Sequence, residues 1–278
     1  ADGSFSDSAY VVSSSFSVSG QASADHVLTT NASGIADITV SYVIPYTVSR
    51  TATVSKGTNP NNVTFETFDV DCVFDVGANY GQYAEMLRKK VGYRGLIVSF
   101  EPIPDAVAHL RKLAARDPRW RVEQVALSNT SGEQAFNIMA ESQFSSLSSP
   151  RHDETVLFRD KNTIRNSIPV KTETLSRAYA RLRAELGFIR PFLKLDTQGY
   201  DVEIVRSGAE VLPDFIGLQS ELAVRKLYEH SVDFVEALAE YRSHGFTLTA
   251  FVPNNGGHFP QLIETDCIML RSDLVLEG

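Results

Sequence analysis

Two neighbouring segments decide the fold: Cys-Val-Phe-Asp-Val-Gly-Ala-Asn-Tyr-Gly-Gln-Tyr at residues 72–83 and Gly-Leu-Ile-Val-Ser-Phe-Glu at residues 95–101. The first five residues form a short apolar run, which predicts a strand buried on both faces, as parallel strands are. A glycine-containing turn follows, and residues 82–91 have helical character with one apolar side. The second segment is another apolar strand that ends at an acid. This order predicts the cofactor-binding half of a doubly wound α/β sheet.

The turn between the first strand and the helix has the chemistry of a ligand site. Gly77 and Gly81 allow positive φ and a close approach of a ligand to bare backbone. The N-terminus of the following helix offers unpaired N–H groups and a partial positive charge, which suit a carboxylate or a phosphate. Glu101 lies 20 residues beyond Gly81, where a carboxylate accepts hydrogen bonds from ribose hydroxyls.

The spacing within the turn bears on which nucleoside is bound. Gly77-x-Asn79-x-Gly81 departs from the Gly-x-Gly-x-x-Gly pattern of dinucleotide binders. Asp75, two residues before the first glycine, would repel a pyrophosphate but pair with an amino group. S-adenosylmethionine carries an ammonium, a carboxylate and a ribose, so we expect it in preference to NAD. The expected cofactor contacts are Asp75, Gly77, Asn79, Gly81 and Glu101.

Five stretches, in family order, resemble the FkbM family of S-adenosylmethionine-dependent methyltransferases. They are Val-Phe-Asp-Val-Gly-Ala-Asn-Tyr-Gly-Gln-Tyr at 73–83, Ser-Phe-Glu-Pro at 99–102, Ala-Leu-Ser-Asn at 126–129, Ser-Ser-Leu at 145–147 and Leu-Lys-Leu-Asp-Thr-Gln-Gly-Tyr-Asp at 193–201. The resemblance covers about residues 66 to 275. It implies a Rossmann-like class I methyltransferase fold, in which a seven-stranded, mostly parallel sheet has helices on both faces and a reversed final hairpin. It also implies that Ser128 lies near the adenine.

The N-terminal residues 1–65 differ in composition, because they are rich in Ser, Thr, Val, Ala and Asn. Apolar and polar residues alternate over 10–18 and again over 35–54, which predicts a few antiparallel strands. A disordered Ser-rich leader is the alternative. We therefore predict a β-rich module or extension at 1–65 and a methyltransferase domain at 66–278. The sequence does not decide whether the module caps the cofactor, binds a partner or mediates self-association, and it does not give the oligomeric state.

Composition limits the partners and the compartment. The formal net charge of −8 and the hydrophobic content of 43% favour a packed protein without nonspecific affinity for nucleic acid or anionic membranes. No apolar run approaches the length of a membrane span. The resemblance places Cys72 and Cys267 on strands that are not neighbours, so we expect no disulfide and a reduced, cytoplasmic setting.

Candidate groups for the reaction follow from the strand ends, because ligands bind outside the carboxyl ends of strands in such sheets. Asp196 and Glu221 end two neighbouring strands, so we expect their carboxylates to face one another across the cleft. Lys194 lies two residues before Asp196 on the same side of the strand, where it is placed to pair with either carboxylate. His230, after the strand of Glu221, is an alternative base.

A polar stretch at residues 141–165 has little periodicity and is long for a connection in a compact domain, which favours a functional or mobile segment. Its candidates for contact with cofactor or acceptor are Ser142, Gln143, Ser145 and Ser146. The alternative is a solvated surface loop.

Methyl transfer from a sulfonium requires the acceptor oxygen in near-attack geometry and removal of its proton. One carboxylate acts as general base, or Asp196 and Glu221 hold Mg²⁺ together with a third oxygen ligand. The sequence identifies no third ligand, so we favour the route without metal. The resemblance implies an O-methyltransferase acting on a hydroxyl of a sugar, glycan or polyketide-type natural product. The alternative is a non-catalytic S-adenosylmethionine-fold binding protein whose N-terminal β module carries a partner interaction.

Overall fold

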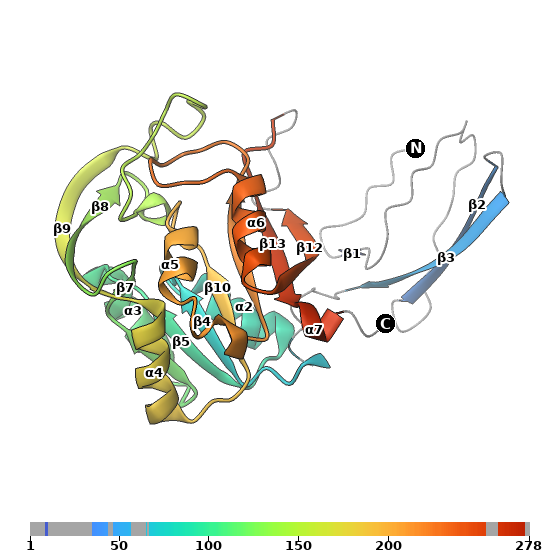
Figure 1. Ribbon diagram of the computed structural model, residues 1–278, viewed down its shortest axis with the longest axis horizontal. Coiled ribbons are helices and arrows are strands. Elements are labelled where there is room, and N and C mark those ends of the chain that lie inside the picture. The colour runs from blue at the N-terminus through green and yellow to red at the C-terminus, as the bar shows by residue number, and fades with distance from the viewer. Residues whose placement is uncertain are drawn as a thin grey trace. The chain divides into compact units, whose positions relative to one another are not determined.

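The computed structural model describes residues 9–10, 35–43, 47–56, 65, 67–253 and 261–275. The chain divides into two compact units, Ala1–Thr67 and Phe68–Gly278. The described part of the first unit is an antiparallel sheet in the order β1-β3-β2, with β1 at Ala9–Tyr10, β2 at Ile35–Val43 and β3 at Thr47–Lys56 (Figure 1). Most of the strand expected over 10–18 lies outside the described residues, and the role of this unit stays a prediction.

The second unit is built on a seven-stranded sheet in the order β12-β13-β11-β10-β4-β5-β6. The strands are β4 (Cys72–Val76), β5 (Leu96–Phe100), β6 (Trp120–Glu123), β10 (Pro191–Leu195), β11 (Gly217–Ala223), β12 (Phe246–Pro253) and β13 (Glu264–Arg271). The five strands from β11 to β6 are parallel, whereas β13 runs antiparallel to both β11 and β12. The predicted Rossmann-like methyltransferase sheet with a reversed final hairpin is confirmed.

Helices cover both faces of this sheet. They are α2 (Gln82–Met86), which continues into the π-helical η1 (Leu87–Val91), α3 (Pro104–Ala114), α4 (Leu175–Leu186), α5 (Asp201–Ser207), α6 (Phe234–Ser243) and α7 (Ser272–Val275), with 3-10 turns η2 (Ser142–Phe144) and η3 (Leu212–Asp214). α4, α5 and α6 pack on one face (Figure 1). Tyr83 of α2 contacts Lys194 on the opposite face. Within the described ranges, no helix is long and apolar enough to cross a membrane.

Side-chain caps explain where two of these helices begin. The Thr174 hydroxyl accepts a hydrogen bond from the backbone N–H of Arg177 at the start of α4. The Asp233 carboxylate accepts the N–H groups of both Val235 and Glu236 at the start of α6. Such caps satisfy N–H groups that have no partner within the helix, and each contributes about 1 kcal/mol.

An aromatic cluster forms the centre of the core beneath α4. The ring centroid of Phe74 on β4 lies 5.4 Å from that of Phe100, 5.4 Å from Phe188 and 5.5 Å from Phe215. Tyr179 of α4 lies 6.4 Å from the same ring. All five side chains are buried, and burial of each contributes on the order of 2 kcal/mol. The apolar run that predicted a two-sided buried strand thus supplies the centre of the domain.

A separate three-stranded sheet lies beside the main one, in the order β7-β9-β8. It consists of β7 (Ala126–Leu127), β8 (Gly132–Met139) and β9 (Ile164–Glu173). The sequence interpretation extended the irregular connection to residue 165 and did not predict a second sheet. The first half of β9 is exposed on both faces, so it lacks the apolar alternation by which strands are recognised.

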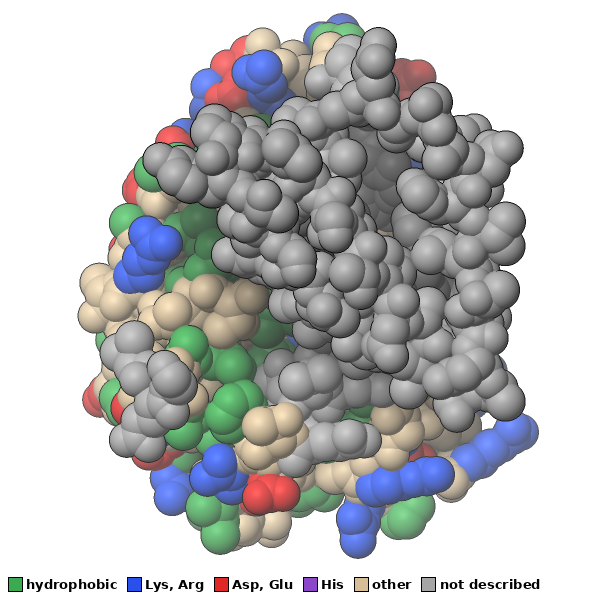
Figure 2. Space-filling view, turned by 90° about the vertical axis from the view of Figure 1, so that its right-hand side faces the viewer, with side chains coloured by type: hydrophobic (Ala, Val, Ile, Leu, Met, Phe, Trp, Pro, Cys, Tyr) green, Lys and Arg blue, Asp and Glu red, His purple; other side chains and the backbone are tan. Residues whose placement is uncertain are grey.

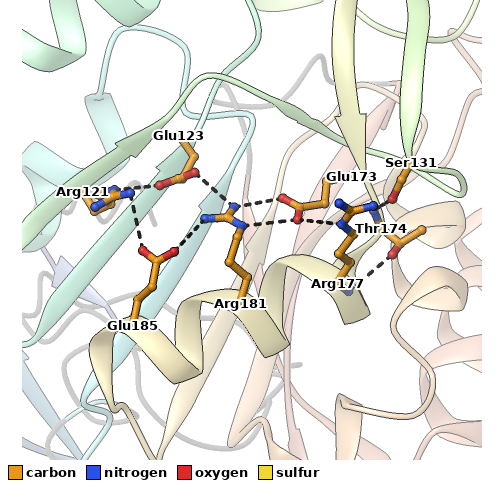
Figure 3. A network of polar contacts seen from close by, with 8 residues as sticks. All are labelled: Arg121, Glu123, Ser131, Glu173, Thr174, Arg177, Arg181 and Glu185. Carbon is orange, nitrogen blue, oxygen red and sulfur yellow. Dashed lines mark hydrogen bonds and ion pairs between the residues drawn. The ribbon is translucent and has the colours of Figure 1, made fainter.

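A network of ion pairs ties the small sheet to the main one (Figure 3). Arg181 of α4 lies 3.1 Å from Glu123 on β6 and 2.9 Å from Glu173 on β9. Arg121 pairs with Glu123 at 2.7 Å and with Glu185 of α4 at 3.6 Å. Glu123 and Glu173 are largely buried, whereas Arg181 is partly exposed. Together these pairs link β6, α4 and β9.

Both cysteines are buried and free. Cys72 lies on β4 and Cys267 on β13, and two strands, β10 and β11, separate them. The absence of a disulfide between them therefore agrees with the sequence prediction. Burial raises the pKa of the Cys267 thiol to about 12, so this sulfur is an inert part of the core.

Candidate functional site

A cavity of about 410 Å³ opens at the carboxyl end of the parallel strands. Its size lies within the range of small-molecule sites, and its place is where ligands bind in open α/β sheets. The walls come from the segments after β4, β5 and β10, from β7 and β8, and from η2. The predicted site residues on its surface are Gly77, Asn79, Glu101, Ser145, Lys194 and Asp196.

Glu101 is held rigidly at the end of β5. Its Oε2 accepts the backbone N–H of Asn79 at 2.8 Å, and its Oε1 accepts the N–H of Ile103 at 2.8 Å. Burial raises the pKa of Glu101 to about 7, although these two N–H groups act to lower it. A carboxylate has about four acceptor positions, so both oxygens retain capacity for donors from a molecule in the cavity.

The structure gives a further reason why residues 77 and 81 are glycines, beyond the close approach of a ligand. Gly77 and Gly81 have φ of 76° and 90°, in the left-handed region. A Cβ on Gly77 would lie 1.9 Å from the carbonyl oxygen of Asp196, and one on Gly81 would lie 2.9 Å from Leu110. Close packing against the backbone of the β10 loop therefore requires glycine at position 77, whereas at position 81 the positive φ is the stronger reason for glycine. Gly77 also lines the cavity, whereas Gly81 does not.

Asn79 lines the cavity and carries a buried acceptor without a partner in the described part of the chain. Its backbone is in the left-handed region, with φ of 47°. Its Oδ1 atom is shielded from solvent and has no hydrogen-bond partner among the described residues. Buried polar atoms are nearly always paired in native proteins, so this oxygen suits a donor on a bound molecule.

Asp75 does not line the cavity but lies beneath it, fully buried. Its Oδ1 lies 3.3 Å from Lys194 Nζ, and its Oδ2 accepts the Ser99 hydroxyl at 3.1 Å. Burial raises the pKa of Asp75, and the charge of Lys194 opposes that shift. Because Asp75 does not line the cavity, the cationic group on the cavity surface is Lys194, and the contact of Asp75 with a ligand stays a prediction.

Lys194 is fixed from several sides. Its Nζ lies 3.7 Å from Asp196 Oδ2 and 5.2 Å from the centroid of the Tyr83 ring. Burial acts to lower the pKa of Lys194, but the charges of Asp75 and Asp196 outweigh it, so the pKa lies above its ordinary value. The lysine is therefore a permanent cation on the cavity floor.

The floor continues as a row of polar groups across β11 and β13. Tyr83 donates its hydroxyl to Gln219 Oε1 at 3.1 Å, and Gln219 donates its amide to Asp266 Oδ2 at 2.8 Å. Burial raises the pKa of Asp266 to about 6, against the Gln219 hydrogen bond, which lowers it. All three side chains line the cavity, so hydrogen bonds within the floor fix its shape.

Asp196 and Glu221, the predicted pair of carboxylates, lie near one another. The side-chain amide of Gln198 bridges them. Gln198 Nε2 donates to Asp196 Oδ1 at 2.9 Å and to Glu221 Oε2 at 3.1 Å. Gln198 Oε1 accepts the Tyr228 hydroxyl at 2.8 Å. The backbone of Gln198 has a φ of 56°, a conformation that persists only where surrounding contacts impose it.

The two carboxylates have different surroundings. The Asp196 side chain is 44% exposed and lines the cavity. Glu221 lies outside the cavity, in a smaller hollow of about 30 Å³ that Glu264 also lines. Burial, and then the neighbouring charges of Glu264 and Asp196, raise the pKa of Glu221 well above its ordinary value. Among the residues with described positions, no three His, Cys, Asp or Glu side chains form a group that could hold a metal ion.

The two predicted serines differ in position. Ser145 lines the cavity, and its hydroxyl accepts the backbone N–H of Met139 at 3.1 Å. The Ser128 hydroxyl accepts the Gln134 amide at 3.0 Å and does not line the cavity. The strand residues just before it, including Leu127, form the wall instead.

His230, the alternative base, lies away from the cavity. Its Nδ1 is 3.1 Å from the Ser148 hydroxyl, and its ring stands 5.5 Å from that of Tyr200. The side chain is exposed and does not line the cavity. The structure therefore brings Asp196, and not His230, to the site.

Several residues of the site were not singled out by the sequence interpretation. Gln198 lies within the family-like stretch at 193–201, where its polar side chain between two acids was an available signal. Gln219 and Asp266 interrupt apolar strands, and polar groups at such positions often belong to a site. Phe136 lines the cavity and belongs to β8, where the sequence indicates a short strand at 134–139 but not its pairing into a second sheet.

The sheet order and the cavity at its carboxyl end define the Rossmann-like class I methyltransferase fold. The chain belongs to the FkbM family of methyltransferases, because the family model of the Methyltransferase FkbM domain matches residues 75–248, more than half of the chain.

Solved structures of methyltransferases resemble the chain at low sequence identity. The FkbM methyltransferase of Methylobacillus flagellatus is 14% identical, with a TM-score of 0.41 over 73% of this chain, which spans 44% of the length of that protein. Fibrillarin of Aeropyrum pernix, with natively bound S-adenosyl-L-methionine, is 10% identical, with a TM-score of 0.42 over 79% of each chain. Magnesium protoporphyrin IX methyltransferase of Synechocystis is 9% identical, with a TM-score of 0.42 over 76% of this chain and 74% of that one. A search of curated protein sequences finds no match.

Proposed function

We propose that this chain binds S-adenosylmethionine in the cavity and transfers its methyl group to a hydroxyl oxygen. One observation carries the proposal: Glu101 is fixed by two backbone N–H groups on the wall of a cavity of about 410 Å³, in a chain of a methyltransferase family. A buried carboxylate with remaining acceptor positions at the end of the second parallel strand suits the two hydroxyls of a ribose.

The remaining walls suit the other parts of the cofactor. Ile103, Leu127 and Phe136 provide an apolar surface, which fits an adenine ring. The unpaired Oδ1 of Asn79 fits an ammonium donor, and the Lys194 cation fits a carboxylate. When bound, S-adenosylmethionine supplies an electrophilic methyl group on a sulfonium.

Asp196 is the proposed general base. Its carboxylate lines the cavity, with one oxygen hydrogen-bonded to Gln198 and the other 3.7 Å from Lys194. It accepts the proton of the acceptor hydroxyl, and such proton removal typically contributes about 10²- to 10⁴-fold in rate. Gln198 is a positioning residue, because it is held by Tyr228 and orients the Asp196 carboxylate. The proposal includes no metal ion, so activity is expected to persist in the presence of a chelator.

The proposed acceptor is a hydroxyl of a sugar, glycan or polyketide-type natural product, the substrate class suggested by the FkbM resemblance. Ser142, Gln143 and Ser145, which carry polar side chains, line the cavity. Hydroxyl and amide groups of this kind suit the hydroxyls of a polyol acceptor better than an apolar one.

Calorimetric titration with S-adenosylmethionine and S-adenosylhomocysteine tests the binding half of the proposal, with NADH as the control ligand. Saturable heat with the first two ligands and none with NADH is expected. Transfer is then assayed with a methyl-labelled cofactor on a panel of sugars and polyketide-type alcohols. No binding at millimolar cofactor would overturn the proposed function, whereas binding without transfer to any hydroxyl would favour a non-catalytic binding protein.

A further inference from the structure

A second hollow, of about 390 Å³, lies at the amino end of the strands β5 and β6. Its lining residues are Arg88, Arg94, Arg116, Asp117, Pro118 and Arg119. Arg94 directly precedes the β5 region and Arg119 directly precedes β6, and these strands are parallel neighbours. The hollow is therefore at the amino end of the strands, whereas the cofactor cavity is at their carboxyl end.

One arginine of the hollow is part of its framework. Arg88 Nε lies 2.7 Å from Asp117 Oδ2, and its other nitrogens donate to the carbonyl oxygens of Tyr93 at 2.9 Å and Arg119 at 3.2 Å. The second carboxylate oxygen of Asp117 accepts the backbone N–H of Arg119 at 3.0 Å. Asp117 thus neutralises Arg88, and the pair fixes the loop that carries the other cations.

Among the described residues, Arg94 and Arg116 have no carboxylate partner, whereas Arg119 shares Asp117 with Arg88. Arg119 donates to the carbonyl oxygen of Arg94 at 2.9 Å, and no ion pair forms to Arg94 or Arg116 within the described ranges. Arg121, only two residues beyond Arg119, pairs with Glu123 at 2.7 Å. Four arginines thus share one carboxylate in this hollow, so the group carries an excess of positive charge that an anion would offset.

The segment of the sequence that forms this hollow is also rich in basic residues. Residues 85–121 contain nine Lys or Arg and four Asp or Glu, although the whole chain has a formal net charge of −8. On the face shown in Figure 2, Lys and Arg side chains predominate over Asp and Glu along the lower margin. A local excess of positive charge on an acidic protein attracts anions to one region of its surface.

We propose that this hollow is a binding site for an oxyanion of the phosphate class, either the free ion or a phosphate ester of a small organic molecule. Guanidinium groups match the geometry of phosphate oxygens with paired N–H donors. Arg94 and Arg116 supply the principal contacts, and Arg119 completes the ring of donors. The site is independent of the proposed methyl transfer, because it lies at the other end of the strands.

Calorimetric titration of the full chain with inorganic phosphate tests this site, with chloride at matched ionic strength as the reference. The variant R94Q/R116Q removes the principal contacts. The variant R165Q/K171Q is the control, because it removes the same charge from exposed positions on β9. We expect phosphate affinity to fall at least tenfold in the first variant and less than twofold in the control. Equal binding of phosphate and chloride, or equal losses in both variants, would overturn the proposal.

The same titration with glycerol phosphate and a hexose phosphate identifies the source of the anion. An affinity at least tenfold above that of inorganic phosphate assigns the hollow to a phosphate ester, whose organic part occupies the remaining volume. An affinity equal to that of inorganic phosphate assigns it to the free ion. Circular dichroism and S-adenosylmethionine binding are measured on each variant, so that a loss of folding is separated from a loss of the site.

Discussion

The two ends of the same parallel strands carry charged side chains in different states. At the carboxyl end, Glu101 and Lys194 are almost fully buried, and each is fixed by hydrogen bonds or ion pairs. At the amino end, Arg94 and Arg116 are exposed, and no described carboxylate pairs with them. Loops tolerate substitution by basic or acidic residues without any change in the strands that they connect. The difference teaches that charges at the first end are part of the folded core, whereas those at the second are additions to it.

The largest expected effect is on catalysis at the carboxyl end. Asp196→Asn keeps the shape of the side chain but removes the proposed base, so we expect kcat to fall by about 10²- to 10⁴-fold, with cofactor affinity little changed. Steady-state kinetics and calorimetry on the same preparation measure both. Glu221→Gln should have a much smaller effect on kcat, because Glu221 lies outside the cavity. The reverse ranking of the two variants would assign the base to Glu221.

The second-largest effect is expected on the free energy of unfolding, when the Lys194 ion pair is removed. Lys194→Met leaves Asp75 buried without its counter-ion, and removal of one partner of a buried pair costs about 3–5 kcal/mol. Urea unfolding at pH 8 measures the loss, and the loss should shrink at pH 5, where a buried carboxyl is more easily protonated. Lys161→Met is the matched control, because Lys161 pairs with Glu141 at 3.3 Å with both side chains nearly half exposed. Equal stability of the two variants would show that the Lys194 pair is not needed.

Cofactor affinity should depend on pH through Glu101. Burial raises the pKa of Glu101 to about 7, and the ionised carboxylate is the better acceptor of ribose hydroxyls. Protonation on going from pH 8 to pH 6 should therefore weaken S-adenosylhomocysteine binding by about tenfold. Calorimetry across this range tests it, and Glu101→Gln should bind weakly with a flat profile. A wild-type profile that is flat as well would remove Glu101 from cofactor binding.

The smallest effect is expected for stability at the amino end. Arg94→Gln with Arg116→Gln should change the free energy of unfolding by about 0.5 kcal/mol or less, because both side chains are exposed. Because the substitutions relieve repulsion among the arginines, we expect a slight gain in stability in phosphate-free buffer. Urea unfolding measures the change, and a loss as large as that of Lys194→Met would erase the distinction between the two ends.

The main sheet could be predicted from sequence because most of its strands contain short apolar runs, and several of these runs end at acids. The run from residue 72 and the acid at 101 gave the positions of β4 and of Glu101 correctly. The small second sheet could not be predicted, because half of β9 is exposed on both sides.

The pairings within the site were beyond the sequence for a different reason. That Asp75 is the counter-ion of Lys194, and that Gln198 separates Asp196 from Glu221, depends on register between strands far apart in the chain. Spacing along one segment carries no information about such register. The requirement for glycine at 77 likewise comes from contact with the β10 loop, more than a hundred residues away.

A crystal structure with S-adenosylhomocysteine bound tests the central claim most directly. We expect the ribose hydroxyls within hydrogen-bond distance of the Glu101 carboxylate, the amino-acid end beside Asn79 and Lys194, and Asp196 facing the sulfur side of the cavity. A ligand bound elsewhere on the chain, or bound in the cavity with its ribose away from Glu101, would contradict the account.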